Sequence, residues 1–470
     1  MYSLKNDLNS HKIAAVQFSF CLLFFANNGL ANKIFYKFSD TLIHRDVKEA
    51  QQLLNNAKPG DTVFLKGGIY FLKDQNLKPT VSGTKKAWIT IMPQRGEEVI
   101  FDGTYYLDSI SKVSNVRGGP QKALIAIMDV KYVQLKNIKV RQSHVIGIVV
   151  EGKNTSNIHI VDCKSSVSHN SGIAIWYADS CKVMKSEITG ANDQALRPAG
   201  QPLRVEAPHE ALTLAGATNF EVAYNSIHDC IKEGIDCKEV SSYGNIHHNT
   251  VYNIPRQGLY VDCWFGRLHH IEFAYNTVYN CEWGFALSAE GKGATMDSIY
   301  AHHNLLYNNR GAGVLFGVWG TDGPRKQIYI YNNTIVNNGK AQHWSGLTGG
   351  IDIMSSNISD VFIYNNISAF NYGYAIATSV QPSDLTAFLI RQNVQITNNV
   401  EWQINTPGTE ISKGIFKPMY PMQGKNAVIA DPLFVNADKM HFQLKKSSPA
   451  RNKGWKKAPY GKAKYLGYIQ

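Results

Sequence analysis

The sequence predicts an all-β protein built as a parallel β-helix, a solenoid in which each coil stacks on the previous one. Two markers keep the same phase along the chain. A glycine followed by alternating apolar residues recurs at steps of 24, 26 and 29 residues, at Gly234, Gly258, Gly284 and Gly313. An asparagine with an apolar residue two positions later recurs at steps of 24, 27, 28 and 29, at Asn225, Asn249, Asn276, Asn304 and Asn333.

The spacing and composition of the repeats favour this solenoid over other repeat folds. Each unit contains short strands separated by Asn and Gly turns, with no helical segment between them. The leucine consensus of leucine-rich repeats is absent, and propeller blades need roughly 40 residues. We assign the repeated asparagines to coil corners, because Asn tolerates left-handed backbone angles and bonds the local backbone. Stacked Asn side chains also form ladders.

The ends of the solenoid differ from its repeats. Residues 46–57 have helical spacing, with one apolar face formed by Val47, Ala50, Leu53, Leu54 and Ala57. This pattern predicts a short N-terminal capping helix. We divide the chain into a signal peptide (1–31), an N-terminal cap with the first coils (32–122), β-helix repeats (123–400), and a C-terminal irregular coil with a basic tail (401–470).

The N-terminus is typical of a secretory signal peptide. Lys5 and Lys12 precede an apolar run over residues 13–26, and Gly29 and Ala31 supply the small residues of a cleavage site. The alternative is a membrane anchor, but a span needs about 20 apolar residues. We therefore expect a secreted or periplasmic protein without an integral membrane segment.

Six cysteines follow the predicted signal. An even count in an exported protein permits disulfides. Strand alternation instead places Cys237 and Cys263 in the core of neighbouring coils, offset by two positions. Cys230 and Cys281 occupy equivalent turns two coils apart, about 10 Å from each other at the spacing of β-strands. That distance is too long for a bridge, so we expect free, buried cysteines.

Charge is distributed unevenly along the chain. Lys and Arg number 48 against 36 Asp and Glu, but residues 410–470 hold 12 basic and 3 acidic residues. Residues 209–293 hold 5 basic and 10 acidic residues. The basic excess therefore does not identify the substrate. We expect that the protein has no nucleic-acid partner and that it is a monomer. The tail is interpreted as solvated surface, with adhesion to an acidic polymer as the alternative.

The acidic segment carries charged side chains on the outer face of the predicted coils. Alternation within the strands sends Asp236, Lys238 and Asp262 outward. Lys238 and Asp262 share one position on adjacent coils, which puts their Cα atoms about 5 Å apart. Glu290 lies one coil beyond Asp262 and two residues along, at about 8 Å by the same geometry.

Two carboxylates at this range predict a glycoside hydrolase. One must be ionised, while the other must retain its proton near neutral pH. Because Lys238 lies beside Asp262, we expect Asp262 to be the ionised nucleophile or base and Glu290 to be the acid, with Asp236 and Lys238 completing the catalytic set. A separation of about 5–5.5 Å implies retention of configuration and about 6.5–9.5 Å implies inversion. Both outcomes stay open.

The expected substrate is a polysaccharide or oligosaccharide, and no cofactor is needed for this chemistry. Trp264, together with Trp283 or Trp319, could offer a stacking face for a sugar ring. The candidate hydrogen-bond donors to the substrate are Arg256, Arg267 and His209.

Three other hypotheses fit the same residues. The first is an exposed charge ladder without chemistry. The second is β-elimination of a uronic-acid polymer, with Lys238 as base and Ca²⁺ held by Asp236, Asp262 and Glu239. Neighbouring carboxylates raise the pKa of a lysine, which opposes a role as base, although a bound Ca²⁺ would reverse this effect. The third is a non-catalytic glycan-binding protein or adhesin.

Several motifs resemble a known family. The segment AKPGDTVFLKGGIY…SGTKKAWITI…VIFDG resembles the N-terminal region of secreted polysaccharide lyases, and DPLFVN…FQLKKSSPARNKG resembles the closing segment of exported β-helix proteins. Together with the repeats, they resemble the right-handed parallel β-helix proteins of the pectate-lyase-like superfamily. This resemblance implies a right-handed helix and a carbohydrate-active protein.

A second, local resemblance concerns the site. The segments GLYVDCW and ALSAEGKG are similar to β-helix glycoside hydrolases of the β-xylosidase type. These enzymes carry a catalytic Asp on one coil and a catalytic Glu on the next. The resemblance implies that Asp262 and Glu290 form the catalytic pair, acting on a plant or algal glycan.

Overall fold

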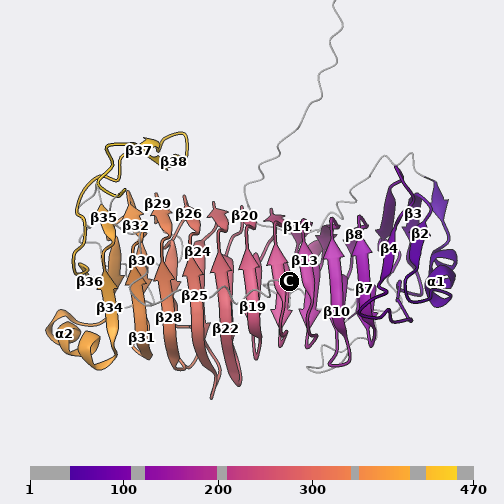
Figure 1. Cartoon of the computed structure of the whole chain (residues 1–470), viewed down its shortest axis with the longest axis horizontal. Helices are drawn as coiled ribbons and strands as arrows, with labels where there is room; N and C mark the ends of the chain where they lie inside the picture. The colour runs from indigo at the N-terminus through magenta and orange to yellow at the C-terminus, as the bar shows by residue number, and fades with distance from the viewer. Residues whose placement is uncertain (1–42, 107–121, 198–208, 340–348, 403–419, 452–470) are drawn as a thin grey trace, which may run out of the picture. The chain divides into compact units, whose positions relative to one another are not determined.

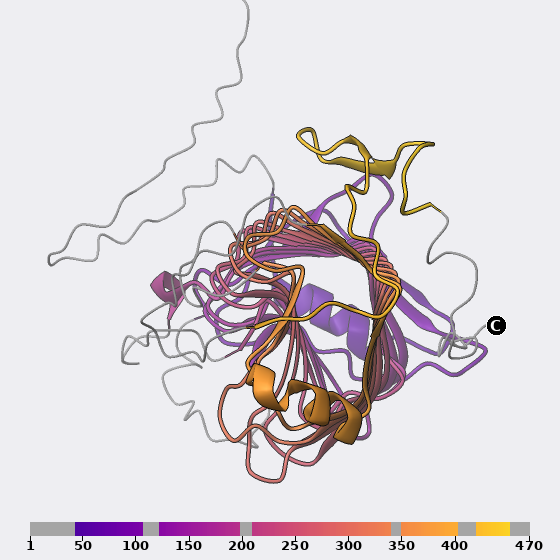
Figure 2. The same cartoon turned by 90° about the vertical axis from the view of Figure 1, so that its left-hand side faces the viewer.

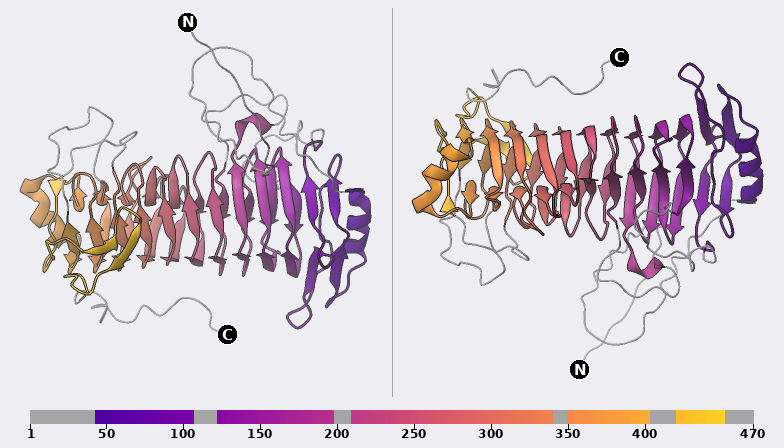
Figure 3. Two further views of the ribbon diagram at one scale, coloured as in Figure 1. Left: turned by 90° about the horizontal axis from the view of Figure 1, so that it is seen from above. Right: turned by 90° about the horizontal axis from the view of Figure 1, so that it is seen from below.

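The computed structural model describes residues 43–106, 122–197, 209–339, 349–402 and 420–451. The predicted signal peptide and the basic residues 452–470 lie outside these ranges. The described chain forms three sheets of stacked strands, here called sheets A, B and C, whose strands follow one another in coil order. The strands lie side by side from the N-terminal to the C-terminal coils (Figure 1), and successive coils overlay when viewed along the stack (Figure 2). Views from above and below show the same stacking (Figure 3).

The bounds of the strands follow the order of the sheets. Sheet A contains β1 (His44–Arg45), β3 (Gly68–Phe71), β5 (Val99–Asp102), β8 (Lys139–Ser143), β11 (Lys164–Ser168), β14 (Glu187–Ala191), β17 (Ser226–His228), β20 (Thr250–Tyr252), β23 (Thr277–Tyr279), β26 (Leu305–Tyr307), β29 (Thr334–Val336), β32 (Ile367–Ala369) and β35 (Val400–Trp402). Sheet B contains β2 (Thr62–Leu65), β4 (Ile89–Pro93), β7 (Lys131–Lys136), β10 (Ser156–Val161), β13 (Lys182–Met184), β16 (Glu221–Ala223), β19 (Ser242–His247), β22 (Arg267–Ala274), β25 (Thr295–His302), β28 (Arg325–Tyr331), β31 (Ile358–Tyr364) and β34 (Val394–Thr397). Sheet C contains β6 (Ala123–Met128), β9 (Ile146–Glu151), β12 (Ile173–Trp176), β15 (Leu212–Ala215), β18 (Ile235–Lys238), β21 (Gln257–Cys263), β24 (Trp283–Ala289), β27 (Val314–Phe316), β30 (Ile351–Ile353), β33 (Ile376–Thr378) and β36 (Tyr420–Pro421).

The pairing within the sheets is parallel, apart from β36, which pairs with β33 in the antiparallel sense. From β6 onward each coil contributes one strand to each sheet. The inward side chains of each coil stack on those of the next in one continuous apolar core. The described part of the C-terminal region adds the antiparallel pair β37 (Phe434–Asn436) and β38 (His441–Leu444). The predicted parallel β-helix is therefore confirmed.

Short helices lie near the two ends of the described stack. Helix α1 (Val47–Asn55) starts at the N-cap Asp46, whose side chain accepts the amide of Lys48. Its buried face confirms the predicted pattern except at Leu53, which is 47% exposed. Near the C-terminal coils lies α2 (Pro382–Arg391), and a 3₁₀ helix, η1, spans Gln194–Leu196. No described helix has the length and apolar character needed to span a bilayer.

The repeated asparagines form a buried ladder between sheets B and A. The Oδ1 atom of Asn276 accepts the backbone and side-chain amides of Asn249, both at 3.0 Å, and its own Nδ2 donates to Asn304 and to the carbonyl of Ile246. The same contacts continue from coil to coil. The structural role that we predicted for these residues is confirmed.

The reason for that role differs from the expected one. The ladder asparagines do not adopt left-handed backbone angles. The preceding residue does, with φ between 54° and 59° at Tyr224, His248, Tyr275 and His303. The left-handed residue turns the chain. The side-chain oxygen of the asparagine that follows it accepts the buried amides of the equivalent corner on the preceding coil.

The six cysteines after the predicted signal are free and buried, as predicted. Cys237 and Cys263 belong to the central apolar core. Their thiols act there as small apolar groups.

We predict that Asn276→Ala lowers the free energy of unfolding by about 2–4 kcal/mol, because two buried amides of Asn249 lose their acceptor and the side-chain oxygen of Asn304 loses a donor. Chemical denaturation followed by circular dichroism measures this change. The control is Asn280→Gly, at an exposed left-handed position (φ 55°), where a cost below about 1 kcal/mol is expected. Equal effects of the two substitutions would contradict the proposed importance of the ladder.

Candidate functional site

The register of sheet C brings the predicted acidic residues together. In β18, Ile235 and Cys237 enter the core, so Asp236 and Lys238 point outward. Lys238 pairs in register with Asp262 of β21. The predicted side-by-side placement of Lys238 and Asp262 is therefore confirmed.

The next coil adds Glu290 directly after β24. Asp262 pairs in register with Ser288, and Glu290 follows two residues later, as the sequence predicted. The hydroxyl of Tyr260 donates a hydrogen bond to Oε1 of Glu290. Tyr260 itself pairs with Asp236 in the adjacent strand. A phenol that the sequence-based site did not include therefore fixes the orientation of the Glu290 carboxylate.

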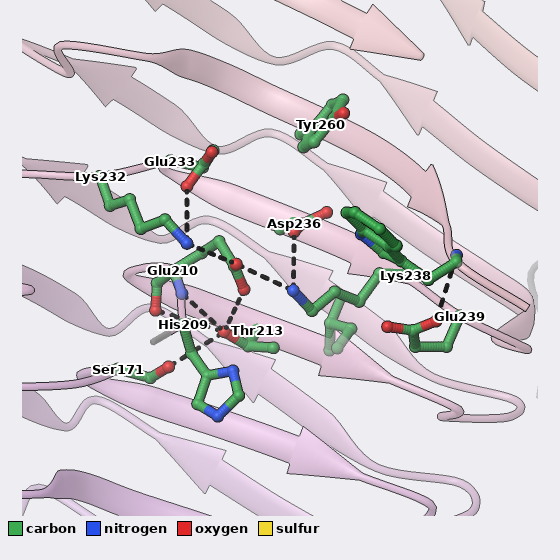
Figure 4. Close-up of polar contacts among 12 residues, drawn as sticks. Ser171, His209, Glu210, Thr213, Lys232, Glu233, Asp236, Lys238, Glu239 and Tyr260 are labelled. Atoms are coloured by element: carbon green, nitrogen blue, oxygen red, sulfur yellow. Dashed lines mark hydrogen bonds and ion pairs between the residues drawn. The ribbon is translucent and has the colours of Figure 1, made fainter. Parts of the chain in front are cut away.

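Lys238 binds a carboxylate that the sequence did not identify. Its ammonium lies 2.8 Å from Oε1 of Glu210, just before β15, and 3.5 Å from Oδ2 of Asp236 (Figure 4). Glu210 also accepts a hydrogen bond from the hydroxyl of Thr213 at 3.0 Å and lies 3.3 Å from the ammonium of Lys232. Lys238 is thus anchored on the side of the earlier coil.

A second set of ion pairs involves Glu233, which lies near Lys232. Glu233 lies 3.7 Å from the Lys232 ammonium and 3.1 Å from Nε of Arg256. Five buried carboxylic acids and three cations thereby form one cluster, the carboxylate cluster, which consists of Glu210, Glu233, Asp236, Asp262 and Glu290 with Lys232, Lys238 and Arg256.

The Glu210–Lys238 pair is charged at neutral pH. Burial opposes ionisation of Glu210, but the nearby ammoniums of Lys238 and Lys232 lower its pKa below the ordinary value. Burial also disfavours the charged form of Lys238, yet Glu210, Asp236 and Asp262 raise its pKa well above the ordinary value. A lysine held in this way keeps its proton.

The two aspartates behave in the opposite way to Glu210. Burial and then repulsion by Asp262 raise the pKa of Asp236 well above its usual range. Burial also raises the pKa of Asp262 well above its usual range, against the attraction of Lys238 and with the help of Glu290. The Oδ1 atoms of both aspartates are buried without a hydrogen-bond partner.

These pKa shifts correct the expected ionisation of Asp262. We expected Lys238 to keep Asp262 ionised, but Asp262 is only 3% exposed and the Lys238 ammonium contacts Glu210 and Asp236 instead. The cost of burying a charge therefore exceeds the attraction of one neighbouring cation. Asp262 favours its protonated form.

Glu290 has a different environment. Burial raises the pKa of its carboxyl above the ordinary value, and the hydrogen bond from Tyr260 and the charge of Lys238 reduce this rise. The phenol stabilises the ionised form of Glu290, and Asp262 has no comparable donor. Of the two acids, Glu290 is the one with a hydrogen-bond donor that stabilises its ionised form.

The aromatic candidates lie on two sides of these acids. Trp264 is 47% exposed directly after β21, and its backbone amide donates to Oε2 of Glu239 at 3.2 Å. Trp319 packs at ring-centroid distances of 5.7 Å from Tyr260 and 5.5 Å from Trp283. Trp319 is therefore connected to the Glu290 side of the cluster through the ring of Tyr260.

The candidate donors are placed less uniformly. Arg256 is part of the carboxylate cluster, and His209 precedes Glu210, with its ring 4.5 Å from that of Trp176. Arg267 is not brought into the cluster. It forms a two-point ion pair with Asp297, at 2.6 and 2.9 Å, between β22 and β25 of sheet B.

The Ca²⁺ hypothesis required Asp236, Asp262 and Glu239 to converge. Within the described ranges, no three His, Cys, Asp or Glu side chains form a group that could hold a metal ion. Asp236 instead faces an ammonium, and Glu239 accepts a backbone amide.

Comparisons with known proteins agree on the fold. The model of the right handed beta helix region matches residues 123–298, and no curated protein matches the chain. The mannuronan C-5 epimerase AlgE4 A-module of Azotobacter vinelandii has 12% identity over 82% of this chain and 93% of its own, with a TM-score of 0.51. An alginate lyase from Paenibacillus sp. str. FPU-7 has 14% identity over 62% and 94%, with a TM-score of 0.44. Pectate lyase Pel9A has 13% identity over 87% of each chain, with a TM-score of 0.44.

At these identities the likeness concerns the fold. The matched region, together with the stacked parallel sheets, identifies the fold as a right-handed parallel β-helix, as the sequence resemblance implied.

Proposed function

We propose that this protein is a glycoside hydrolase that uses Asp262 and Glu290 as a pair of carboxyl groups. The observation that carries the proposal is their unequal environment on adjacent coils. The Oδ1 atom of Asp262 is buried and has no hydrogen-bond partner, whereas Glu290 accepts a hydrogen bond from Tyr260. Groups whose surroundings separate their pKa values are suited to act as acid and base in one reaction.

We assign the two roles in the order opposite to the one expected from the sequence. Protonated Asp262 donates its proton to the glycosidic oxygen as the bond to the leaving sugar breaks. Ionised Glu290 attacks the anomeric carbon or removes a proton from the attacking water. In either case the Tyr260 hydroxyl holds Glu290 in position and keeps its own proton, because burial raises the pKa of Tyr260 well above its usual range.

The charge of the cluster favours an uncharged sugar at the cleavage point. A uronate would meet several buried carboxylic acids, and Lys232 and Lys238 are already paired with Glu210. A neutral ring can stack on the exposed Trp264 or on Trp319. We therefore propose a plant or algal polysaccharide or oligosaccharide as substrate, met outside the cytoplasm in keeping with the export predicted from residues 1–31.

A polysaccharide lyase is the second candidate, and one observation favours it. Lys238 and Tyr260 supply an amine and a phenol from adjacent strands, which are group types suited to proton abstraction and donation during elimination. We rank it second because Glu210, Asp236 and Asp262 raise the pKa of Lys238, and Tyr260 donates to Glu290.

We predict that incubation with a panel of neutral and uronic-acid glycans releases new reducing ends from a neutral member. Reducing-end assays and the ultraviolet absorbance of unsaturated uronates are measured on the same samples. Absorbance that appears with cleavage, and disappears with a chelator, would show a metal-dependent lyase. Retained binding without turnover of any member would favour a glycan-binding protein.

We predict that Asp262→Asn and Glu290→Gln each lower kcat by about 10²–10⁴-fold, the usual contribution of a general acid or base. Steady-state kinetics on the cleaved glycan measures the loss, and circular dichroism checks the fold. Asp297→Asn is the matched control, because its carboxylate pairs with Arg267 on sheet B. Full activity in both site variants would show that the assignment is wrong.

The pH profile of kcat/KM tests the proposed roles. Activity should fall at high pH as Asp262 loses its proton, and at low pH as Glu290 gains one. Tyr260→Phe removes a hydrogen bond that lowers the pKa of Glu290, so the acidic limb should move to higher pH. An acidic limb that stays in place, or moves to lower pH, contradicts the role of Glu290 as base.

A further inference from the structure

Arg325 occupies a position of the apolar core. In β28 it pairs in register with Met296 on one side and Ile358 on the other. Both neighbours belong to the central core cluster, and Arg325 is 0% exposed. A guanidinium therefore stands where the adjacent coils place apolar side chains.

The guanidinium connects the two ends of one loop. Its Nη2 atom donates to the carbonyl of Gly317 at 2.7 Å, and Nη1 lies 3.0 Å from Oδ1 of Asp322. Asp322 also accepts a hydrogen bond from the hydroxyl of Ser355 at 2.7 Å. The segment 317–323, here called the brace loop, is thus fixed from inside the coil.

The brace loop holds the main chain of Glu290. The amide of Thr321 donates to the Glu290 carbonyl at 2.7 Å, and the Thr321 hydroxyl donates to the same oxygen at 2.9 Å. The amide of Gly323 donates to Ala289 at 2.7 Å. At Gly320 (φ 78°) a Cβ atom would lie 2.3 Å from the Glu290 carbonyl, so the loop and Glu290 are in close contact.

The same loop supports the partner of the Glu290 carboxylate. It carries Trp319, whose ring packs against Tyr260 at 5.7 Å. Tyr260 in turn donates its hydroxyl proton to Glu290. The brace loop therefore contacts Glu290 at the backbone and, through Tyr260, at the carboxylate.

Burying an arginine at this core position costs free energy. Neither Nε nor Nη1 has a hydrogen-bond acceptor, so Nη1 contacts Asp322 only as an ion pair, and burial lowers the pKa of Arg325. Replacing a buried ion pair by an apolar side chain of similar volume is often neutral or stabilising. Asp322 would keep its hydrogen bond with Ser355 and is partly accessible to solvent, so loss of the arginine would not strand a buried charge. Stability of the core alone gives no reason for Arg325.

We propose that Arg325 is a positioning residue, which holds the brace loop so that Glu290 and Tyr260 keep the geometry needed for catalysis. This inference rests on the proposed function of Glu290. Arg325 contacts neither the substrate nor the reacting atoms, and it acts through Gly317 and Asp322.

The test uses Arg325→Met, with Met296→Leu as a matched control in the same stack of side chains. We expect Arg325→Met to keep or raise the melting temperature, because it removes a buried charge. Hydrogen exchange measured by mass spectrometry should become faster in residues 317–323 and unchanged in the control. On the glycan that the unmodified protein cleaves, kcat should fall by about 10²-fold, as expected for small displacements of catalytic groups.

Two further variants separate positioning from folding. Arg325→Lys keeps a charge that can reach one partner and should restore part of kcat. Thr321→Val removes only the hydroxyl contact with Glu290 and should lower kcat without a matching loss of stability. A variant Arg325→Met that loses stability while its kcat is unchanged would make the arginine purely structural and overturn the proposal.

The exchange measurement also separates this proposal from the proposed function. If no glycan is cleaved, the hydrolase assignment fails, yet exchange in the brace loop still reports on Arg325. Faster exchange at an unchanged melting temperature supports its positioning role, and unchanged exchange overturns it.

Discussion

The fixed register between coils is the constraint on which the site depends. In a parallel stack, alternation decides whether a side chain enters the core or points outward, and a slip of one residue would reverse every side chain of a strand. The asparagine ladder opposes such a slip, because each rung both accepts from and donates to a neighbouring coil. Asp236, Lys238 and Asp262 meet on the outer face of sheet C because this register is kept.

The backbone part of the site could be predicted from the sequence, because it follows from two short periods. Alternation and the repeat length were enough to place Cys237 inward, Lys238 beside Asp262, and Glu290 one coil further. The choice of partners by long side chains was not predictable in this way. Lys238 turns toward Glu210, which lies before β15 at a position without a repeat marker. Tyr260 of one coil reaches Glu290 of the next. Alternation within the strand predicted that Tyr260 points outward, but alternation does not specify which residue an outward side chain contacts.

The pKa values of the acids in the site depend on burial, which the sequence pattern of a single strand does not contain. Outward side chains of a sheet are commonly accessible to water, and a nearby lysine then keeps a carboxylate ionised. Here Asp236 and Asp262 are 1% and 3% exposed. At that depth the penalty for a charge, together with repulsion between acids, exceeds the attraction of one ammonium. Burial is a collective result of several coils, so the direction of the pKa shift of Asp262 could not be derived from its own strand.

The scaffold and the site make opposite use of buried polar groups. Each ladder asparagine has its hydrogen bonds satisfied, which stabilises the stack and repeats wherever the coil repeats. Other buried polar atoms have no hydrogen-bond partner, and among them are Oδ1 of Asp262 in the site and Nε of Arg325 behind the brace loop. A solenoid tolerates such places because each coil contacts mainly its neighbours, and the cost of one coil is spread over the stack. The five buried acids gathered in the carboxylate cluster are therefore better evidence for a functional site here than the charge of the chain as a whole.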